Sequence, residues 1–217
     1  DDCGNSNTAS QVITLEDTVA PDFANVPQDV TVECDEALPT GEPTITDACD
    51  SNPSLTMDEQ QVGGSCPQEL VITRTWTATD ACGNSSTASQ VVSTSDSDDP
   101  VFANVPQDVT IDCNETAPTG TPTATDNCDN DVQIDVNETT SAGQCAGEEV
   151  ITRTWTATDD CGNTATVSQT ITRTDSEGPV LMGVPADATA NCGTVPPVPT
   201  VTATDDCDTN PIVTLDE

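Results

Sequence analysis

Apolar and polar residues alternate along several short stretches of the chain. Residues 30–33 read Val-Thr-Val-Glu, and from Ile72 to Ala78 the apolar residues and threonines again alternate. No stretch carries a helical period. Glycine, proline, asparagine and aspartate interrupt the alternating stretches at 39–41, 51–53, 63–65 and 83–84. The pattern predicts an all-β fold with six or seven short strands in about 80 residues, arranged as an immunoglobulin-like β-sandwich.

The sequence repeats itself at an interval of 79 residues, because FANVPQDVT occurs at 23 and 102 and ITRTWTATD at 72 and 151. We therefore expect a tandem array of one small domain. The expected boundaries are the tail of a preceding repeat, two complete repeats and the N-terminal half of a following repeat: 1–16, 17–95, 96–174 and 175–217. The two fragments indicate a window on a longer chain; completion by neighbouring identical subunits is the alternative.

The composition is acidic and excludes several function classes. There are 39 Asp and Glu against 3 Lys and Arg, with no His, for a formal net charge of -36. Without histidine there is no His general base, no Ser-His-Asp triad and no imidazole metal site. Three arginines are too few for a nucleic-acid interface. No apolar run approaches the ~20 residues of a membrane span. We expect a protein that is not an enzyme.

The 11 cysteines fall on the same 79-residue interval, at four positions per repeat. An up-and-down strand order places the first and third of these positions at one end of the domain, and the second and fourth at the other. It predicts the disulfides Cys34–Cys66, Cys49–Cys82, Cys113–Cys145 and Cys128–Cys161. Cys3, Cys192 and Cys207 are then expected to have partners outside the chain. Free thiols or a zinc site are the alternative, although no C-x-x-C spacing exists. Disulfides at this density indicate an oxidising, extracellular compartment.

Some of the acidic residues recur at fixed places, four residues before a proline in each linker and around the second and fourth cysteines. If the linker and these two turns meet at one end of the domain, their oxygen ligands suit Ca²⁺, which takes 6–8 oxygens. The candidate metal ligands are Asp17, Asp47, Asp50, Asp80, Asn84, Asp96, Asp98, Asp126, Asp129, Asp159, Asn163, Asp175, Asp205 and Asp208. The alternative is that these aspartates cap turns through hydrogen bonds to backbone N–H groups. Life in high salt is a further explanation of the acidity.

Arg74, and Arg153 in the next repeat, interrupt the apolar face that Ile72, Trp76 and Ala78 form. Each arginine either pairs with a carboxylate or lays its stem over the tryptophan beside it. An arginine near the sheet edge that reaches solvent is the alternative.

Three motifs resemble those of hyalin-repeat (HYR-like) domains: the linker Asp17-Thr-Val-Ala-Pro21, the turn Ala-Thr-Asp-Asn-Cys at 124–128, and the hairpin from Trp76 to Asn84. The cysteines make the chain most similar to the cysteine-bearing versions found in large surface and adhesin proteins of gliding and marine bacteria. The resemblance covers essentially the whole chain. It implies an immunoglobulin-type sandwich, secretion, and a stalk or adhesion role, and it transfers no catalytic residue.

We expect a structural segment of an extracellular filament or cell-surface adhesin, with disulfide-locked repeats and linkers stiffened by Ca²⁺. The expected partners are adjoining repeats or identical subunits, and a surface glycan bound by a part outside this segment, without nucleic acid or membrane insertion. The alternative function is an array of carbohydrate-binding modules, for which Trp76 and Trp155 are the only candidate sugar platforms. Their alternation places both tryptophans inward.

Overall fold

The structure is a computed structural model that describes residues 2–194 and 196–216. It divides into two compact units, Asp1–Ser97 and Asp98–Glu217. All regular structure in the described residues is β-strand, which confirms the all-β prediction. The described part of the chain holds no helix long and apolar enough to span a lipid bilayer.

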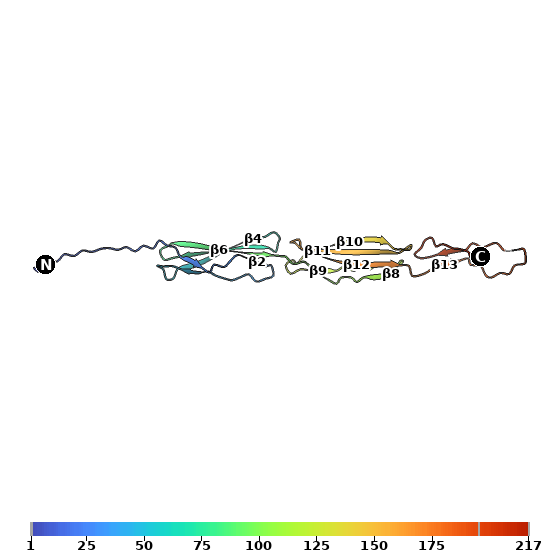
Figure 1. The fold of residues 1–217 in the computed structure, drawn as a ribbon, viewed down its shortest axis with the longest axis horizontal. Coiled ribbons are helices and arrows are strands. Elements are labelled where there is room, and N and C mark those ends of the chain that lie inside the picture. The colour runs from blue at the N-terminus through green and yellow to red at the C-terminus, as the bar shows by residue number, and fades with distance from the viewer. Residues whose placement is uncertain (1, 195, 217) are drawn as a thin grey trace. The chain divides into compact units, whose positions relative to one another are not determined.

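The first unit contains six strands in two sheets (Figure 1). They are β1 (Asp22–Ala24), β2 (Val30–Glu33), β3 (Thr44–Thr46), β4 (Ser54–Gly63), β5 (Leu70–Thr79) and β6 (Ser85–Ser95). One sheet has the order β2-β6-β5-β4, in which β2 runs parallel to β6 and the other pairs are antiparallel. The second sheet is the short antiparallel pair β1-β3, and β1 contacts β6 across the two layers. This arrangement is the predicted sandwich.

The second unit repeats this arrangement and adds a fragment of it (Figure 1). Its four-stranded sheet has the order β10-β11-β12-β8. The unit also contains two separate antiparallel pairs of short strands, β7-β9 and β13-β14. The strands are β7 (Val101–Ala103), β8 (Val109–Asp112), β9 (Thr123–Thr125), β10 (Gln133–Ala142), β11 (Glu149–Thr158), β12 (Thr164–Thr174), β13 (Val180–Met182) and β14 (Thr202–Thr204). The β13-β14 pair matches β1-β3 in position within the repeat, so the tandem repetition read from the sequence is confirmed.

The core of each repeat is a narrow stripe along the tryptophan-bearing strand. On β5, Ile72 and Ala78 are fully buried and Trp76 is 2% exposed, in the alternating pattern that the sequence predicts. β4 beside it is almost entirely exposed, including Met57 and Val62. The apolar core is therefore small, as expected from a chain with so few large apolar side chains.

Polar contacts position the edge strand β2. The Gln90 side chain on β6 is buried, and its Nε2 donates to the Gln28 carbonyl over 2.7 Å. One residue further along, the Val91 backbone N–H on β6 donates to Oδ1 of Asp29, the residue directly before β2, at 2.7 Å. The second repeat has the same pair of bonds, from Gln169 Nε2 to the Gln107 carbonyl and from Thr170 N–H to Asp108 Oδ1. Side-chain hydrogen bonds thus set the register at which the chain joins the sheet.

All four predicted disulfides are wrong. Cys113 is bonded to Cys207, 94 residues away with a Cα–Cα distance of 5.8 Å, and not to Cys145. Cys49 and Cys82 are both exposed and reduced. Cys34 and Cys66 are each disulfide-bonded but not to each other, and the same is true of Cys128 and Cys161. Cys207 was expected to find its partner outside the chain, and that expectation is also wrong.

The strand order explains why Cys34 and Cys66 do not pair. Cys34 follows β2 at one edge of the sheet, whereas Cys66 lies in the turn between β4 and β5 at the other side, with β6 between them. Strands are spaced about 4.8 Å apart, so two or three spacings separate the two turns by about 10–14 Å. A disulfide needs Cα atoms within about 7 Å. Strand direction predicts at which end of the domain each cysteine lies, but not how far apart two cysteines are across the sheet. Cys113 and Cys145 fail to pair for the same reason.

The narrow core predicts a large cost for a single truncation on β5. Replacing Ile72 by alanine should lower the free energy of unfolding of its unit by about 2–5 kcal/mol, since the side chain is fully buried. Guanidinium unfolding of the full chain, with disulfides intact, measures this. The control is Val62→Ala on β4, where the side chain is 61% exposed and little change is expected. Equal effects of the two substitutions would contradict this description of the core.

Candidate metal centre

The linker and two turns meet at one end of the first repeat. One turn follows β3 and contains Asp47 and Asp50; the other joins β5 to β6 and contains Asp80 and Asn84. Asn84 Nδ2 donates to the Asp17 carbonyl at 3.1 Å, which ties the linker to the β5–β6 turn. Asp50 Oδ2 accepts a bond from the Ala81 backbone N–H at 2.9 Å, which ties the two turns to each other.

Three carboxylates converge where these segments meet. Asp17, Asp47 and Asp80 each offer an oxygen, and these atoms all lie within 4.8 Å of one another. Asp80 is buried and the other two are half-buried. Three like charges at this separation repel one another unless a cation or protons neutralise them.

The same aspartates also cap the turns. Asp47 Oδ1 accepts bonds from the backbone N–H groups of Cys49 and Asp50, both at 2.8 Å. Asp80 Oδ1 accepts from Cys82 at 2.8 Å and from Asn84 at 2.9 Å, and its Oδ2 accepts from Asn84 Nδ2 at 2.7 Å. Capping and metal binding are compatible, because none of these bonds uses Asp47 Oδ2 and only one uses Asp80 Oδ2. Each carboxylate therefore still has a lone pair to offer.

The hydrogen bonds and the clustered charge shift two pKa values at this end. Burial raises the pKa of Asp80, but the Asn84 amide and the surrounding backbone N–H groups outweigh it and hold that pKa below its usual range. The pKa of the Cys49 thiol is raised, first by the negative charge of Asp17, then by burial and by Asp47. Asp80 is therefore anionic at neutral pH, while Cys49 is held as the thiol.

The second repeat reproduces both turns. Asp126 Oδ1 accepts from the N–H groups of Cys128 at 2.8 Å and Asp129 at 3.0 Å, as Asp47 does. Asp159 Oδ1 accepts from three backbone N–H groups, and its Oδ2 accepts from Asn163 Nδ2 at 2.9 Å. The remaining oxygen, Asp126 Oδ2, is buried without a hydrogen-bond donor. A buried anionic oxygen with no donor is costly unless a cation occupies the space beside it.

A further acidic group lies in the fragment that follows the second repeat. Asp175, Asp205 and Asp206 each place an oxygen within 4.8 Å of the others and of the Cys207 sulfur. Asp205 Oδ1 caps its turn by accepting from Cys207 and Asp208, and these bonds lower the pKa of Asp205. Asp206 is absent from the sequence-predicted ligands, because the corresponding residues in the complete repeats are Ala48 and Asn127. A second acidic residue directly before the cysteine was the only available signal.

The other predicted ligands have different surroundings. Both oxygens of Asp50 accept backbone N–H groups, from Asn52 and Ala81, and Asp129 does the same with Asp131 and Asp160. Asp208 Oδ1 accepts from Asn210 N–H. Asp96 is buried at the end of β6, and Asp98 accepts a bond from Asn127 Nδ2 at 3.1 Å. Asp50, Asp129 and Asp208 therefore stabilise turns, whereas Asp17, Asp47 and Asp80 form the cluster.

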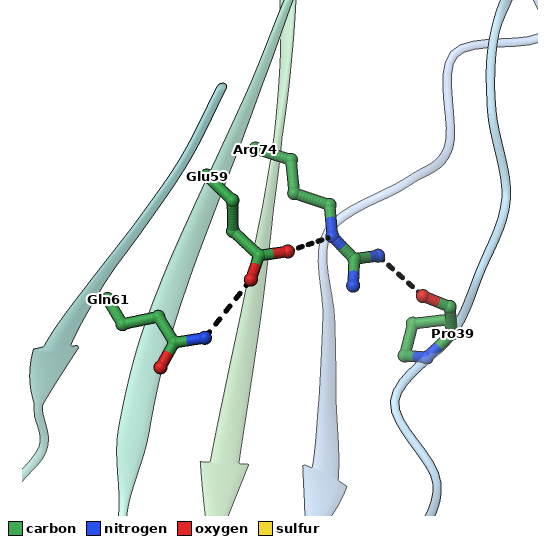
Figure 2. Close-up of polar contacts among 4 residues, drawn as sticks. All are labelled: Pro39, Glu59, Gln61 and Arg74. Atoms are coloured by element: carbon green, nitrogen blue, oxygen red, sulfur yellow. Dashed lines mark hydrogen bonds and ion pairs between the residues drawn. The ribbon is translucent and has the colours of Figure 1, made fainter. Parts of the chain in front are cut away.

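Arg74 lies inward and is paired with a carboxylate (Figure 2). Its Nε donates to Glu59 Oε2 at 3.0 Å, its Nη1 donates to the Pro39 carbonyl at 2.5 Å, and Glu59 accepts a further bond from Gln61. The side chain of Arg74 is 11% exposed. Its position on β5 connects the edge strand β4 to the segment before β3. Of the sequence-based alternatives, the ion pair is therefore the one observed.

This ion pair generates a pH prediction. The Arg74 hydrogen bond lowers the pKa of Glu59, so the stabilisation by Glu59 is complete above its unfolded pKa of about 4.3 and is lost as the pH falls through the lower folded value. The difference in unfolding free energy between the wild type and Glu59→Gln should be constant near neutral pH and should shrink below about pH 4.3. Denaturant unfolding at a series of pH values measures it.

The control for this series is Asp58→Asn on the same strand, since Asp58 accepts only a Gln60 amide at 3.3 Å among the described contacts. A difference for Glu59→Gln that does not change with pH would show that the ion pair contributes nothing to stability.

Comparison with known proteins places the chain in a family. Residues 22–94 and 101–172 match the family described as HYR-like domain with 4 cysteines. No curated protein sequence matches the chain.

Solved structures with some similarity include the EC1-4 region of Drosophila N-cadherin, at 14% identity and a TM-score of 0.30, covering 74% of this chain and 52% of that one. Another is the extracellular domain of protocadherin GammaB4, at 17% identity and a TM-score of 0.31, covering 75% of this chain and 34% of that one. The chain spans about half the length of the first and a third of the second.

The family match includes nearly all of both complete repeats and confirms the resemblance seen in the motifs. The chain belongs to the family of HYR-like domains with four cysteines and carries two tandem copies of that domain.

Proposed function

We propose that this chain is a structural segment of an extracellular filament or cell-surface adhesin, in which Ca²⁺ stiffens the linkers between disulfide-joined repeats. In this proposal the repeats are 17–95 and 96–174, with the tail of a preceding repeat at 1–16 and the first half of another at 175–217. Membership of a family of small tandem β-domains supports the structural part. Disulfide bonds support an extracellular location, since they persist in oxidising compartments.

The observation that carries the proposal is the convergence of Asp17, Asp47 and Asp80. Asp17 belongs to the linker, whereas the other two belong to the turns at the end of the domain. A cation held by all three would join the linker to the domain and remove bending freedom at this point. Carboxylate oxygens are the ligands that Ca²⁺ prefers, and backbone carbonyls and water would complete its 6–8 ligands.

No arginine neutralises this cluster. The three arginines of the chain are each paired with a glutamate on the neighbouring strand of the same sheet: Arg74 with Glu59, Arg153 with Glu138, and Arg173 with Glu149. The chain has no lysine or histidine. A divalent metal ion is therefore the counter-charge that we propose for the three aspartates. The buried Asp126 oxygen without a donor supports the same proposal for the second repeat.

The alternative, a carbohydrate-binding module, finds less support. An aromatic sugar platform needs an exposed ring, and Trp76 and Trp155 are each 2% exposed. The chain has no tyrosine, and its two phenylalanines, Phe23 and Phe102, lie half-buried on the short strands β1 and β7. A structural, non-catalytic role remains the function that these residues fit best.

Thermal unfolding of the full chain with and without millimolar Ca²⁺ tests the proposal. Ca²⁺ should raise the melting temperature, since a ligand at a hundredfold excess over its Kd stabilises the folded state by about 2.7 kcal/mol. The informative variant is Asp47→Asn, because the amide oxygen still caps the turn while the charge is lost. It should reduce the Ca²⁺ effect on the first unit and leave the stability without Ca²⁺ unchanged or higher, as repulsion is relieved.

Asp58→Asn is the matched control and should keep the full Ca²⁺ effect. If Mg²⁺ or NaCl at equal ionic strength raises the melting temperature as much as Ca²⁺ does, the aspartates act only as turn caps and solvated charge, and the proposal is wrong.

A further inference from the structure

Two of the four cysteine positions are connected by a bond that can be followed in the second unit. The first-position cysteines are Cys34, Cys113 and Cys192, and the second-position cysteines are Cys49, Cys128 and Cys207. Cys113 belongs to the repeat 96–174, whereas Cys207 belongs to the fragment that follows it. The Cys113–Cys207 bond therefore joins a first-position cysteine to the second-position cysteine of the next repeat.

The two turns that carry this bond also fit each other without it. Asn114 Nδ2 donates to Asp206 Oδ2 at 2.6 Å. Gly147, with a φ of 80°, lies so close to the Cys207 turn that a Cβ there would meet the Cys207 carbonyl oxygen at 2.9 Å and its Cβ at 3.0 Å. The contact is a docked surface on which the cysteines are brought together, and not a bond between two loose loops.

Cys49 has the same local structure as Cys207. The Cys49 N–H donates to Asp47 Oδ1 at 2.8 Å, and the Cys207 N–H donates to Asp205 Oδ1 at 2.9 Å. In both turns the next aspartate caps the residue two positions further on. The difference is that Cys207 is half-buried and oxidised, whereas Cys49 is exposed and reduced.

Cys192 is in turn equivalent to Cys113. Each follows the first residue of a turn closed by a backbone hydrogen bond, from Thr194 N–H to the Asn191 carbonyl at 3.1 Å and from Glu115 N–H to the Asp112 carbonyl at 3.0 Å. Cys192 is exposed and reduced. In the described residues, Cys49 is thus a reduced second-position cysteine and Cys192 a reduced first-position cysteine.

We propose that Cys49 is a covalent attachment site for another repeat of this type, with which it forms a disulfide through the cysteine in the Cys113 position of that repeat. Cys192 has the Cys113 position in its own repeat, so a second copy of this chain serves as the probe for that partner. The structure does not bond Cys49 to Cys82 in the neighbouring turn, although the Asp50 carboxylate ties the two turns together through the Ala81 N–H. The attachment is independent of the proposed Ca²⁺ site.

The bond requires an oxidant, which a small-molecule disulfide such as oxidised glutathione supplies. One cysteine thiolate attacks the glutathione disulfide, forming a mixed disulfide and releasing one glutathione thiolate. The second cysteine thiolate attacks the protein sulfur of that mixed disulfide and releases the other glutathione. The two protein thiols lose two protons and two electrons, and the oxidant is reduced to two glutathione molecules.

Two variants of the full chain test this without disturbing the core, since only exposed cysteines are replaced. One carries Cys3→Ser, Cys145→Ser and Cys192→Ser and keeps Cys49; the other carries Cys3→Ser, Cys49→Ser and Cys82→Ser and keeps Cys192. They are mixed in a glutathione redox buffer with a metal chelator, and the products are examined by non-reducing electrophoresis and by mass spectrometry of disulfide-linked peptides. The expected product is a heterodimer linked by Cys49 and Cys192.

The matched control uses a second chain that also carries Cys192→Ser and so retains only Cys145 as an exposed thiol. The Cys49 and Cys192 turns keep the backbone geometry of the Cys207 and Cys113 turns, although Ala48 and Gly193 replace the Asp206–Asn114 hydrogen bond. Because Cys145 lies in a turn of a different kind, the control should give a yield of heterodimer that is lower by about tenfold or more. Equal linkage of Cys49 to Cys145, a Cys49–Cys82 bond within one chain, or Cys49 left as its glutathione adduct would each overturn the proposal.

Discussion

Aspartate carboxylates accept hydrogen bonds from backbone N–H groups at the end of each domain where the linker enters. The structure of that end depends on these bonds. Asp47 and Asp80 each cap a turn, and Asp50 then joins the two turns by accepting the Ala81 N–H. Hydrogen bonds to a charged acceptor are stronger than those between neutral groups, and they hold short turns that have little apolar surface to bury. Because these bonds already connect the turns, no disulfide is needed between them, and Cys49 and Cys82 of the first repeat are left exposed.

The disulfide-bonded cysteines explain how so small a core is compatible with a folded domain. The core of each repeat is a stripe of apolar residues on β5 and β6, or on β11 and β12, and the outer strand, β4 or β10, is exposed along nearly its whole length. A disulfide such as Cys113–Cys207 restricts the unfolded chain over a separation of 94 residues, which in the chain-entropy model stabilises by about 4–5 kcal/mol. Stability is thus shared between repeats instead of being complete within each one.

Charge is arranged in two regions with different chemistry. On the sheets, the three arginines are paired with glutamates and connect neighbouring strands, as Arg74 does through Glu59 and the Pro39 carbonyl. At the turns, aspartates gather without any basic residue. This separation leaves the aspartates at the ends of the domains without a basic side chain as partner.

The sequence by itself determined the all-β class, the tandem repetition, the inward tryptophan and the grouping of Asp17, Asp47 and Asp80 at one end. These features follow from the local alternation of apolar and polar residues, from the recurrence of identical segments and from strand direction. All three can be seen in the sequence without knowing which strands are neighbours. Only the tertiary structure decided the disulfide pairing, the position of Arg74 and the role of Asp50. The physical reason is lateral order: strand direction places Cys34 and Cys66 at the same end, but the parallel pairing of β2 with β6 puts a strand between them. That pairing depends on Gln90 and Asp29, whose partners lie 62 residues away in the chain and leave no local pattern.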